Sequence, residues 1–192
     1  MKETQILFQG WKVKKILEWD RTVYMQTRRI INPQPVKQLS QLAGAWWTYY
    51  WMSGGMWNDA GKVAKCRYGQ IGDRLWVRES YALAGSLFYR ADGMPDQEVL
   101  DLNPKWHWRP SIFMPRCFSR ITLEIVKIRM ERVQEITNND ALAEGTPDLR
   151  TLENKWDLRD CYRELWNSIN AKRGFGWDVN PWVWVIEFKR VA

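Results

Sequence analysis

Residues 167–185 read Asn-Ser-Ile-Asn-Ala-Lys-Arg-Gly-Phe-Gly-Trp-Asp-Val-Asn-Pro-Trp-Val-Trp-Val, and Ile-Glu-Phe-Lys-Arg follows them. The last part, residues 182–188, is apolar on both faces that a strand presents, so we expect a strand in the middle of a closed or covered sheet. The first part, residues 172–176, is a turn-rich basic loop that carries cations, glycines and a phenylalanine. Cations bind phosphates and aromatic rings stack on bases, so Lys172 and Arg173 are candidate nucleic-acid contacts.

A helix is expected immediately before this loop, because apolar residues recur there at spacings of three and four. They are Leu158, Cys161, Tyr162, Leu165, Trp166 and Ile169. A second amphipathic helix is expected around residues 13–17, with Lys12, Lys14 and Lys15 on its solvent face.

Short strands are expected at residues 6–8, 27–31, 74–79 and 87–90, and a longer one begins at residue 121. Its apolar residues first occupy odd positions and then switch to Val126, Ile128 and Met130, as a β-bulge would produce. Thr137 is a good N-cap for a short helix that runs through Glu144 and ends at Gly145. Many short strands and few helices predict an α+β fold, a small and mostly antiparallel β-barrel with flanking helices.

The composition indicates one domain over residues 1–192, with an irregular, aromatic-rich insertion at about residues 33–70. We see no apolar run long enough to cross a bilayer and no signal peptide, and so expect a cytoplasmic protein. Cys66, Cys117 and Cys161 are widely spaced and there is a single histidine, His107. This pattern predicts buried free thiols rather than a metal site, and no cofactor.

The chain is basic, with a net charge of +7 and a pI near 9.4, and it holds 14 tryptophans. The charge favours a polyanionic partner, although a merely soluble basic protein has the same property. So many tryptophans in a small domain indicate an aromatic-lined concavity as well as a core.

With one histidine, a Ser-His-Asp set is not credible, and catalysis would need hydroxyl, carboxylate and cationic side chains. Arg21 and Thr27 form one such cluster, in which the hydroxyl is flanked by cations; an edge strand with solvated arginines is the alternative. Glu144 is a second candidate, since small apolar neighbours can desolvate a carboxylate; a solvated helix end is the alternative.

Alternating aromatic and basic residues on neighbouring strands form a third cluster, suited to stacking bases and binding phosphates. A barrel exterior with cation–π contacts is the other interpretation. The candidate nucleic-acid contacts are Arg28, Arg29, Trp76, Arg78, Glu79, Tyr89, Trp108, Ser111, Arg116, Lys172 and Arg173.

Several blocks of the sequence follow one another in a recognisable order. The central block, residues 68–79, reads Tyr-Gly-Gln-Ile-Gly-Asp-Arg-Leu-Trp-Val-Arg-Glu, and residues 109–116, 119–124 and 141–145 follow before the C-terminal block. These blocks resemble phage and prophage proteins that carry an ASCH domain, a member of the PUA-like superfamily. The resemblance covers most of the chain except residues 33–65. It implies a PUA-like β-barrel with a cleft that binds RNA or modified bases.

Some small ASCH proteins are amidohydrolases that remove the acetyl group from acetylcytidine, with a G-x-K-T-x-T motif and a distant glutamate. The resemblance places Thr27 and Glu144 in these roles, but Arg21 stands where the motif has lysine. An arginine cannot replace lysine in proton transfer, although it can stabilise an oxyanion. Other relatives have been proposed to be ribonucleases.

The function that the sequence favours is therefore binding of RNA or a modified nucleoside in a basic, aromatic-lined cleft. Deacylation of acetylcytidine-type nucleosides is the alternative. A second alternative is a phage accessory module that binds a host protein through an exposed aromatic surface at residues 46–57.

Overall fold

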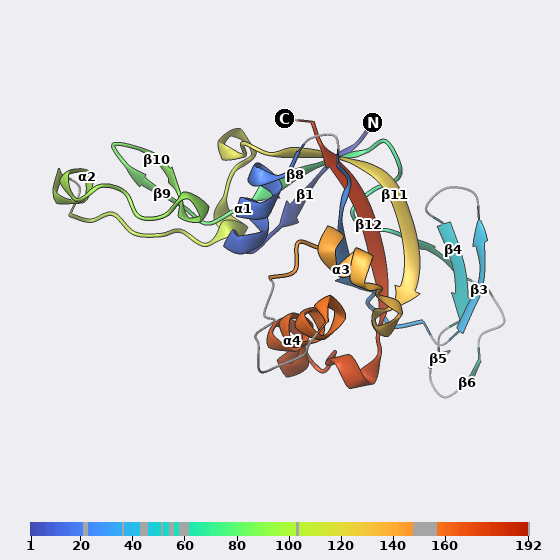
Figure 1. Cartoon of the computed structure of the whole chain (residues 1–192). Helices are drawn as coiled ribbons and strands as arrows, with labels where there is room; N and C mark the ends of the chain where they lie inside the picture. Colours follow the sequence, from blue (N-terminus) through green and yellow to red (C-terminus); the bar gives the residue numbers. More distant parts are fainter. Residues whose placement is uncertain are drawn as a thin grey trace. The chain divides into compact units, whose positions relative to one another are not determined.

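The computed structural model describes residues 1–20, 23–35, 37–42, 46–50, 52–53, 56–57, 62–102, 104–147 and 157–191, and gives only the backbone for those between 37 and 64 (Figure 1). The chain forms two compact units. Unit 1 comprises Met1–Val23, Gly72–Glu124 and Lys189–Ala192, and unit 2 comprises Tyr24–Ile71 and Ile125–Phe188. Each unit is built from separate stretches of the chain, so the division does not cut the sequence into two consecutive domains. The single domain stays a prediction.

The main sheet has five strands in the order β1-β8-β11-β12-β2. The bounds are β1 Glu3–Leu7, β8 Arg74–Arg78, β11 Thr122–Arg132, β12 Trp182–Arg190 and β2 Met25–Ile30. β1 runs parallel to β8, whereas β8–β11 and β12–β2 are antiparallel, so the sheet is mixed. The α+β class is confirmed. The pairings among described residues leave β1 and β2 at the sheet edges, and a closed barrel stays a prediction.

β12 lies between β11 and β2, as its sequence predicts. A strand is buried on both faces only where other elements pack on each face, and Val183 and Val185 on one face of β12 share a core cluster with Tyr162 and Trp166. The buried residues at consecutive positions are Val183, Trp184, Val185 and Ile186.

Unit 1 packs helix α1 (Gly10–Glu18) with β1, β8 and the start of β11. Its buried residues include Ile6, Val13, Ile16, Leu75 and Val77. A hairpin of β9 (Tyr81–Ala84) and β10 (Ser86–Tyr89), followed by α2 (Gln97–Leu102), forms an extended arm of this unit (Figure 1). The 3-10 helices η1 (Arg90–Asp92), η2 (Ser111–Phe113) and η3 (Arg116–Phe118) complete it.

Unit 2 places α3 (Asn138–Ala143) and α4 (Leu158–Asn170) beside β12 and β2 (Figure 1). Tyr162 and Trp166 of α4 share one core cluster with Val183 and Val185 of β12. This unit also holds η4 (Val133–Glu135), η5 (Ala171–Arg173) and η6 (Trp177–Val179).

The predicted insertion contributes further strands to unit 2. β3 (Lys37–Leu42), β4 (Trp46–Tyr50) and β7 (Lys62–Lys65) form a three-stranded sheet, and β5 (Met52–Ser53) pairs with β6 (Met56–Trp57). The aromatic run 46–50 is therefore a strand. Whether its side chains form an exposed surface lies outside what the structure describes.

Two expectations about buried residues need correction. Lys12, expected on the solvent face of α1, is only 3% exposed, and its ammonium lies 5.9 Å from the centroid of the Trp11 ring. Of the three free thiols, those of Cys66 and Cys161 are buried as predicted, but that of Cys117 is exposed on η3. Burial raises the pKa of Cys66 to about 11, so this thiol remains protonated near neutral pH.

The strand that begins near residue 121 shows the predicted change of phase. Ile121, Leu123 and Ile125 are buried at odd positions, and Ile128 and Met130 at even positions. Among the helices of the described residues, none has the length and apolar character needed to cross a membrane.

Candidate functional site

A cleft in unit 1 forms where two parallel strands end. β1 and β8 pair from Glu3 with Arg74 to Leu7 with Arg78, so their carboxyl ends meet at the same edge of the sheet. The residues after β1 and the residues after β8 are therefore neighbours, and the amide of Phe8 donates to the carbonyl of Arg78. Ligands commonly bind in the crevice beyond the carboxyl ends of parallel strands.

The cleft has a volume of about 510 Å³, which is in the size range of small-molecule sites. The segment after β1 and the first turns of α1 contribute Phe8, Gln9, Gly10, Trp11 and Lys14. The segment after β8 and the 3-10 helices η1 and η2 contribute Glu79, Ser80, Arg90, Ala91 and Ser111.

The wall formed by α1 is positively polarised and holds an oriented aromatic ring. The first turn contains no acidic residue, and the N-cap Gln9 makes no capping hydrogen bond with its side chain. Gln9 Oε1 instead accepts a hydrogen bond of 2.7 Å from the indole Nε1 of Trp11. The helix dipole and Lys14, one turn further on, therefore act in the same direction and favour an anionic ligand.

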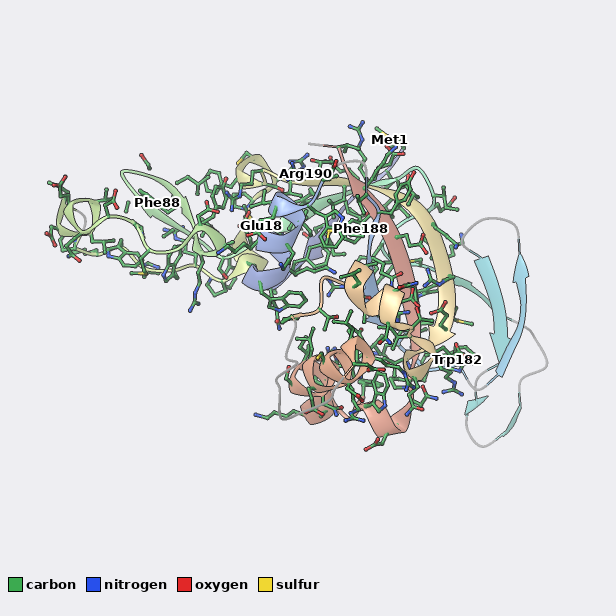
Figure 2. All side chains as sticks on the ribbon, viewed as in Figure 1. Met1, Glu18, Phe88, Trp182, Phe188 and Arg190 are labelled. Atoms are coloured by element: carbon green, nitrogen blue, oxygen red, sulfur yellow. The ribbon has the colours of Figure 1, made fainter. Side chains whose placement is uncertain are left out.

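The other end of α1 is anchored by the last strand. Arg190, labelled near Glu18 in Figure 2, donates from Nη1 to the carbonyls of Ile16 at 3.1 Å and Leu17 at 2.9 Å. These carbonyls are among those that a helix C-terminus leaves unpaired. With Ile16 buried as well, the helix holds Trp11 and Lys14 in place at the cleft.

Glu79 is the acidic residue of the cleft lining, and a guanidinium holds both of its oxygens. Arg120 donates from Nε to Oε1 at 2.9 Å and from Nη2 to Oε2 at 3.0 Å. Arg120 also binds Asp92 at 2.7 and 2.8 Å, and its guanidinium lies 3.9 Å from the centroid of the Tyr89 ring. Burial raises the pKa of Glu79, and Arg120 only partly opposes this shift.

Trp76, Arg78 and Arg116, three of the candidate nucleic-acid contacts, form a second cluster in unit 1. The two guanidinium groups lie 4.8 and 5.9 Å from the centroid of the Trp76 ring. Both arginines have other partners, since Arg78 donates to the carbonyl of Ile112 at 2.8 Å and Arg116 pairs with Glu3 at 2.9 Å. This arrangement matches the alternative interpretation, a strand exterior with cation–π contacts.

Unit 2 contains a buried ionic network around Arg28. The Arg28 side chain is fully buried and pairs with Glu131 at 3.2 Å, Glu144 at 3.3 Å and Asp140 at 3.5 Å. Arg129 also pairs with Glu131 and Asp140. Glu144 is therefore an ion-pair partner that helps to join the end of α3 to β2.

Asp140 connects this network to the start of α3. Burial raises its pKa, but hydrogen bonds from the amide and hydroxyl of Thr137 and the charge of Arg28 outweigh burial, and the pKa falls to about 2. The capping box between Thr137 and Asp140 is the one that the sequence predicts at this helix.

Thr27 and Glu144, two members of the predicted catalytic set, lie on different sides of β2. Gln26 and Arg28 of β2 both contact Asp140, so this face of the strand is directed towards α3. Because side chains alternate along a strand, Thr27 lies on the opposite face from Arg28 and its partner Glu144. Arg21 lies outside the described residues. The catalytic roles of these three residues stay a prediction.

The remaining candidates are distributed over both units. In unit 1, Trp108 packs against Trp106 with ring centroids 5.6 Å apart. In unit 2, Arg29 lies 5.9 Å from the ring centroid of Tyr68, and Lys172 and Arg173 are exposed on η5. Of the residues predicted to contact nucleic acid, Glu79 and Ser111 line the cleft, and Tyr89 packs against Arg120, which holds Glu79.

Sequence reasoning missed Phe8, Trp11 and Lys14 as site residues, whereas Arg90 belongs with Tyr89 to the cluster of alternating aromatic and basic residues. The three missed residues come from the segment after β1, and the parallel pairing of β1 with β8 brings this segment to the residues after β8. A helix that starts directly after a strand, with a tryptophan and a lysine in its first turns, is a signal that could have pointed to them.

Comparisons of the chain with protein-family models, with curated proteins and with solved structures find no match.

Proposed function

We propose that this protein binds a nucleoside, or a nucleotide within single-stranded RNA, in the unit 1 cleft. The observation that supports this most strongly is the combination of side chains in one small concavity: the aromatic rings of Phe8 and Trp11, the cations Lys14 and Arg90, and the carboxylate of Glu79. Single-stranded nucleic acid is recognised by stacking on aromatic rings, by cations at the backbone, and by polar groups at base edges.

The basic, aromatic cluster around Trp76 supports binding less well. Its arginines are held by a carbonyl and a carboxylate, and a phosphate would have to compete with these partners. The cleft has fewer arginines, but its cations are better placed to bind a ligand.

The resemblance to ASCH proteins agrees with this proposal, because such domains bind RNA or modified bases in a cleft. A PUA-like barrel is accordingly the fold that we propose for the chain. We also propose a cytoplasmic location, since free cysteines are typical of a reducing compartment. Deacylation and host-protein binding stay predictions, and no contact in the described residues favours either one.

The experiment is a titration of fluorescently labelled single-stranded RNA at low salt, followed by anisotropy. Trp11→Ala removes a ring from the cleft, and we expect binding about tenfold weaker, since stacking on one ring contributes about 1–3 kcal/mol. Trp19→Ala is the matched control, because Trp19 is at the other end of α1 and does not line the cleft.

Circular dichroism should show that both variants keep the fold. Absence of RNA and nucleoside binding by the wild type, or equal affinities for wild type and Trp11→Ala, would overturn the proposal.

A further inference from the structure

The charges of the cleft indicate what its ligand carries. Within the described part of the chain, the side chains of Lys14 and Arg90 have no carboxylate partner, and both line the cleft together with the first turn of α1. Elsewhere in unit 1 the cations Arg116 and Arg120 are paired, with Glu3 in one case and with Glu79 and Asp92 in the other. The cleft is therefore a place where unit 1 offers unneutralised positive charge to a ligand.

A phosphate group suits the charges of the cleft better than a neutral ribose does. Two cations and the amide groups at a helix N-terminus each favour a bound anion. Helix α1 also carries Trp11, whose ring is oriented by its hydrogen bond to Gln9. A ligand with an aromatic base and a phosphate would use both features, whereas a nucleoside would leave the cations without a partner.

Glu79 adds a requirement for a hydrogen-bond donor on the base. Its carboxylate is 2% exposed, lines the cleft, and is held by Arg120 through both oxygens. Each carboxylate oxygen can accept more than one hydrogen bond, so capacity remains for a ligand. A carboxylate accepts and does not donate, so it favours an exocyclic amine over a carbonyl or a bare C–H at the same position.

We infer that the cleft binds a nucleotide whose base carries an exocyclic amino group, with the phosphate at Lys14 and Arg90 and the amine donating to Glu79. The inference rests on the proposed function and narrows its ligand class. A free nucleotide and a nucleotide within RNA share this chemistry.

Calorimetric titration of the full chain tests the phosphate requirement. We compare CMP and AMP with cytidine and adenosine, and expect the better-binding nucleotide to bind at least about tenfold more tightly than its nucleoside. The double variant Lys14→Ala/Arg90→Ala should remove this difference. Lys15→Ala is the matched control and should retain it, because Lys15 is paired with Glu18 on the same helix and does not line the cleft.

The amine requirement is tested with ligands that lack only that group, namely the 5′-monophosphates of zebularine and purine riboside. We expect the amine-free partner of the better-binding nucleotide to bind about tenfold more weakly to the wild type. In Glu79→Gln the amide oxygen should accept from Arg120, and the amide N–H₂ should then face the ligand. The preference for amine-bearing nucleotides should therefore disappear. The wild-type comparison decides this point even where that variant does not fold.

Equal affinities for nucleotide and nucleoside, or for ligands with and without the amine, would overturn this inference and leave the proposed function standing. Absence of binding by every nucleoside, nucleotide and single-stranded RNA would instead overturn the proposed function.

Discussion

Glu79 is a side chain that its neighbours fix in position at the wall of the cleft. Arg120 neutralises it and sets its orientation, and Asp92 and Tyr89 fix Arg120 in turn. Supporting contacts of this kind are what keep a binding group within the narrow range of geometries that recognition needs. In the sequence, Glu79 is only the last residue of an alternating strand, and nothing there connects it to Arg120.

The raised pKa of Glu79 predicts that recognition of the amine depends on pH. Ionised Glu79 accepts a hydrogen bond, and the raised pKa means that protonation begins at a higher pH than for an ordinary glutamate, whose value is 4.5. The preference for amine-bearing nucleotides should therefore be full at about pH 8 and should fall on acidification before the pH reaches that ordinary value.

Calorimetry of an amine-bearing nucleotide and its amine-free partner at several pH values measures this preference. Glu79→Gln serves as the control, because its side chain does not titrate. A wild-type preference that stays constant down to about pH 4 would show that Glu79 does not contact the amine.

Helix α3 is the element whose stability depends most clearly on one titrating group. In the folded protein the pKa of Asp140 is lowered to about 2 from its ordinary 3.8, so ionised Asp140 stabilises the fold at pH values above about 4. This contribution, about 2 kcal/mol, should be lost progressively as the pH falls from about 4 towards 2.

Urea denaturation of wild type and Asp140→Asn checks this prediction. We expect a difference in unfolding free energy of about 2 kcal/mol at about pH 6 that shrinks as the pH falls from about 4 and approaches zero only at about pH 2 and below, where Asp140 is itself protonated. Asp160→Asn is the control, since Asp160 closes the capping box of α4 without contacting the buried network, and its cost should stay below about 1 kcal/mol. A difference for Asp140→Asn that does not vary with pH would contradict the role of this charge.

The elements were predictable from the sequence wherever periodicity was strong. The stripe at residues 158–169 lies in α4, residues 182–188 lie in the interior strand β12, and Thr137 caps α3. The pairing of distant strands was not predictable. The parallel register of β1 and β8 depends on contacts between segments about 70 residues apart, and local patterns carry no information about it.

At the scale of the whole molecule, the predicted site residues divide between two units. Trp76 and Glu79 belong to unit 1, and Arg28 and Glu144 belong to unit 2. The candidate catalytic cluster around residues 21–29 contributes Arg28 to a buried ionic network instead of to an open pocket. Buried arginines of this kind cannot be distinguished from binding arginines by composition, because both occur beside apolar residues.

The net charge of +7 predicts that RNA binding weakens as salt increases, but only a small part of that charge should contact phosphate. For single strands the logarithm of the affinity falls with the logarithm of salt by about 0.7 for each phosphate contact. We therefore expect the slope between about 50 and 200 mM salt to drop by roughly one in Lys14→Ala/Arg90→Ala. The account would be contradicted if this variant kept the wild-type salt slope while Lys172→Ala/Arg173→Ala reduced it. That result would locate the phosphate contacts in unit 2.

Ultraviolet crosslinking of the wild-type protein to single-stranded RNA, followed by mass spectrometry of the crosslinked peptides, locates the bound base directly. If the base stacks in the unit 1 cleft, the crosslinks should concentrate on Phe8 and Trp11, and unlabelled nucleotide should compete them away. Crosslinks confined to Trp76, or to peptides around Lys172 and Arg173, would show that the cleft is not the binding site.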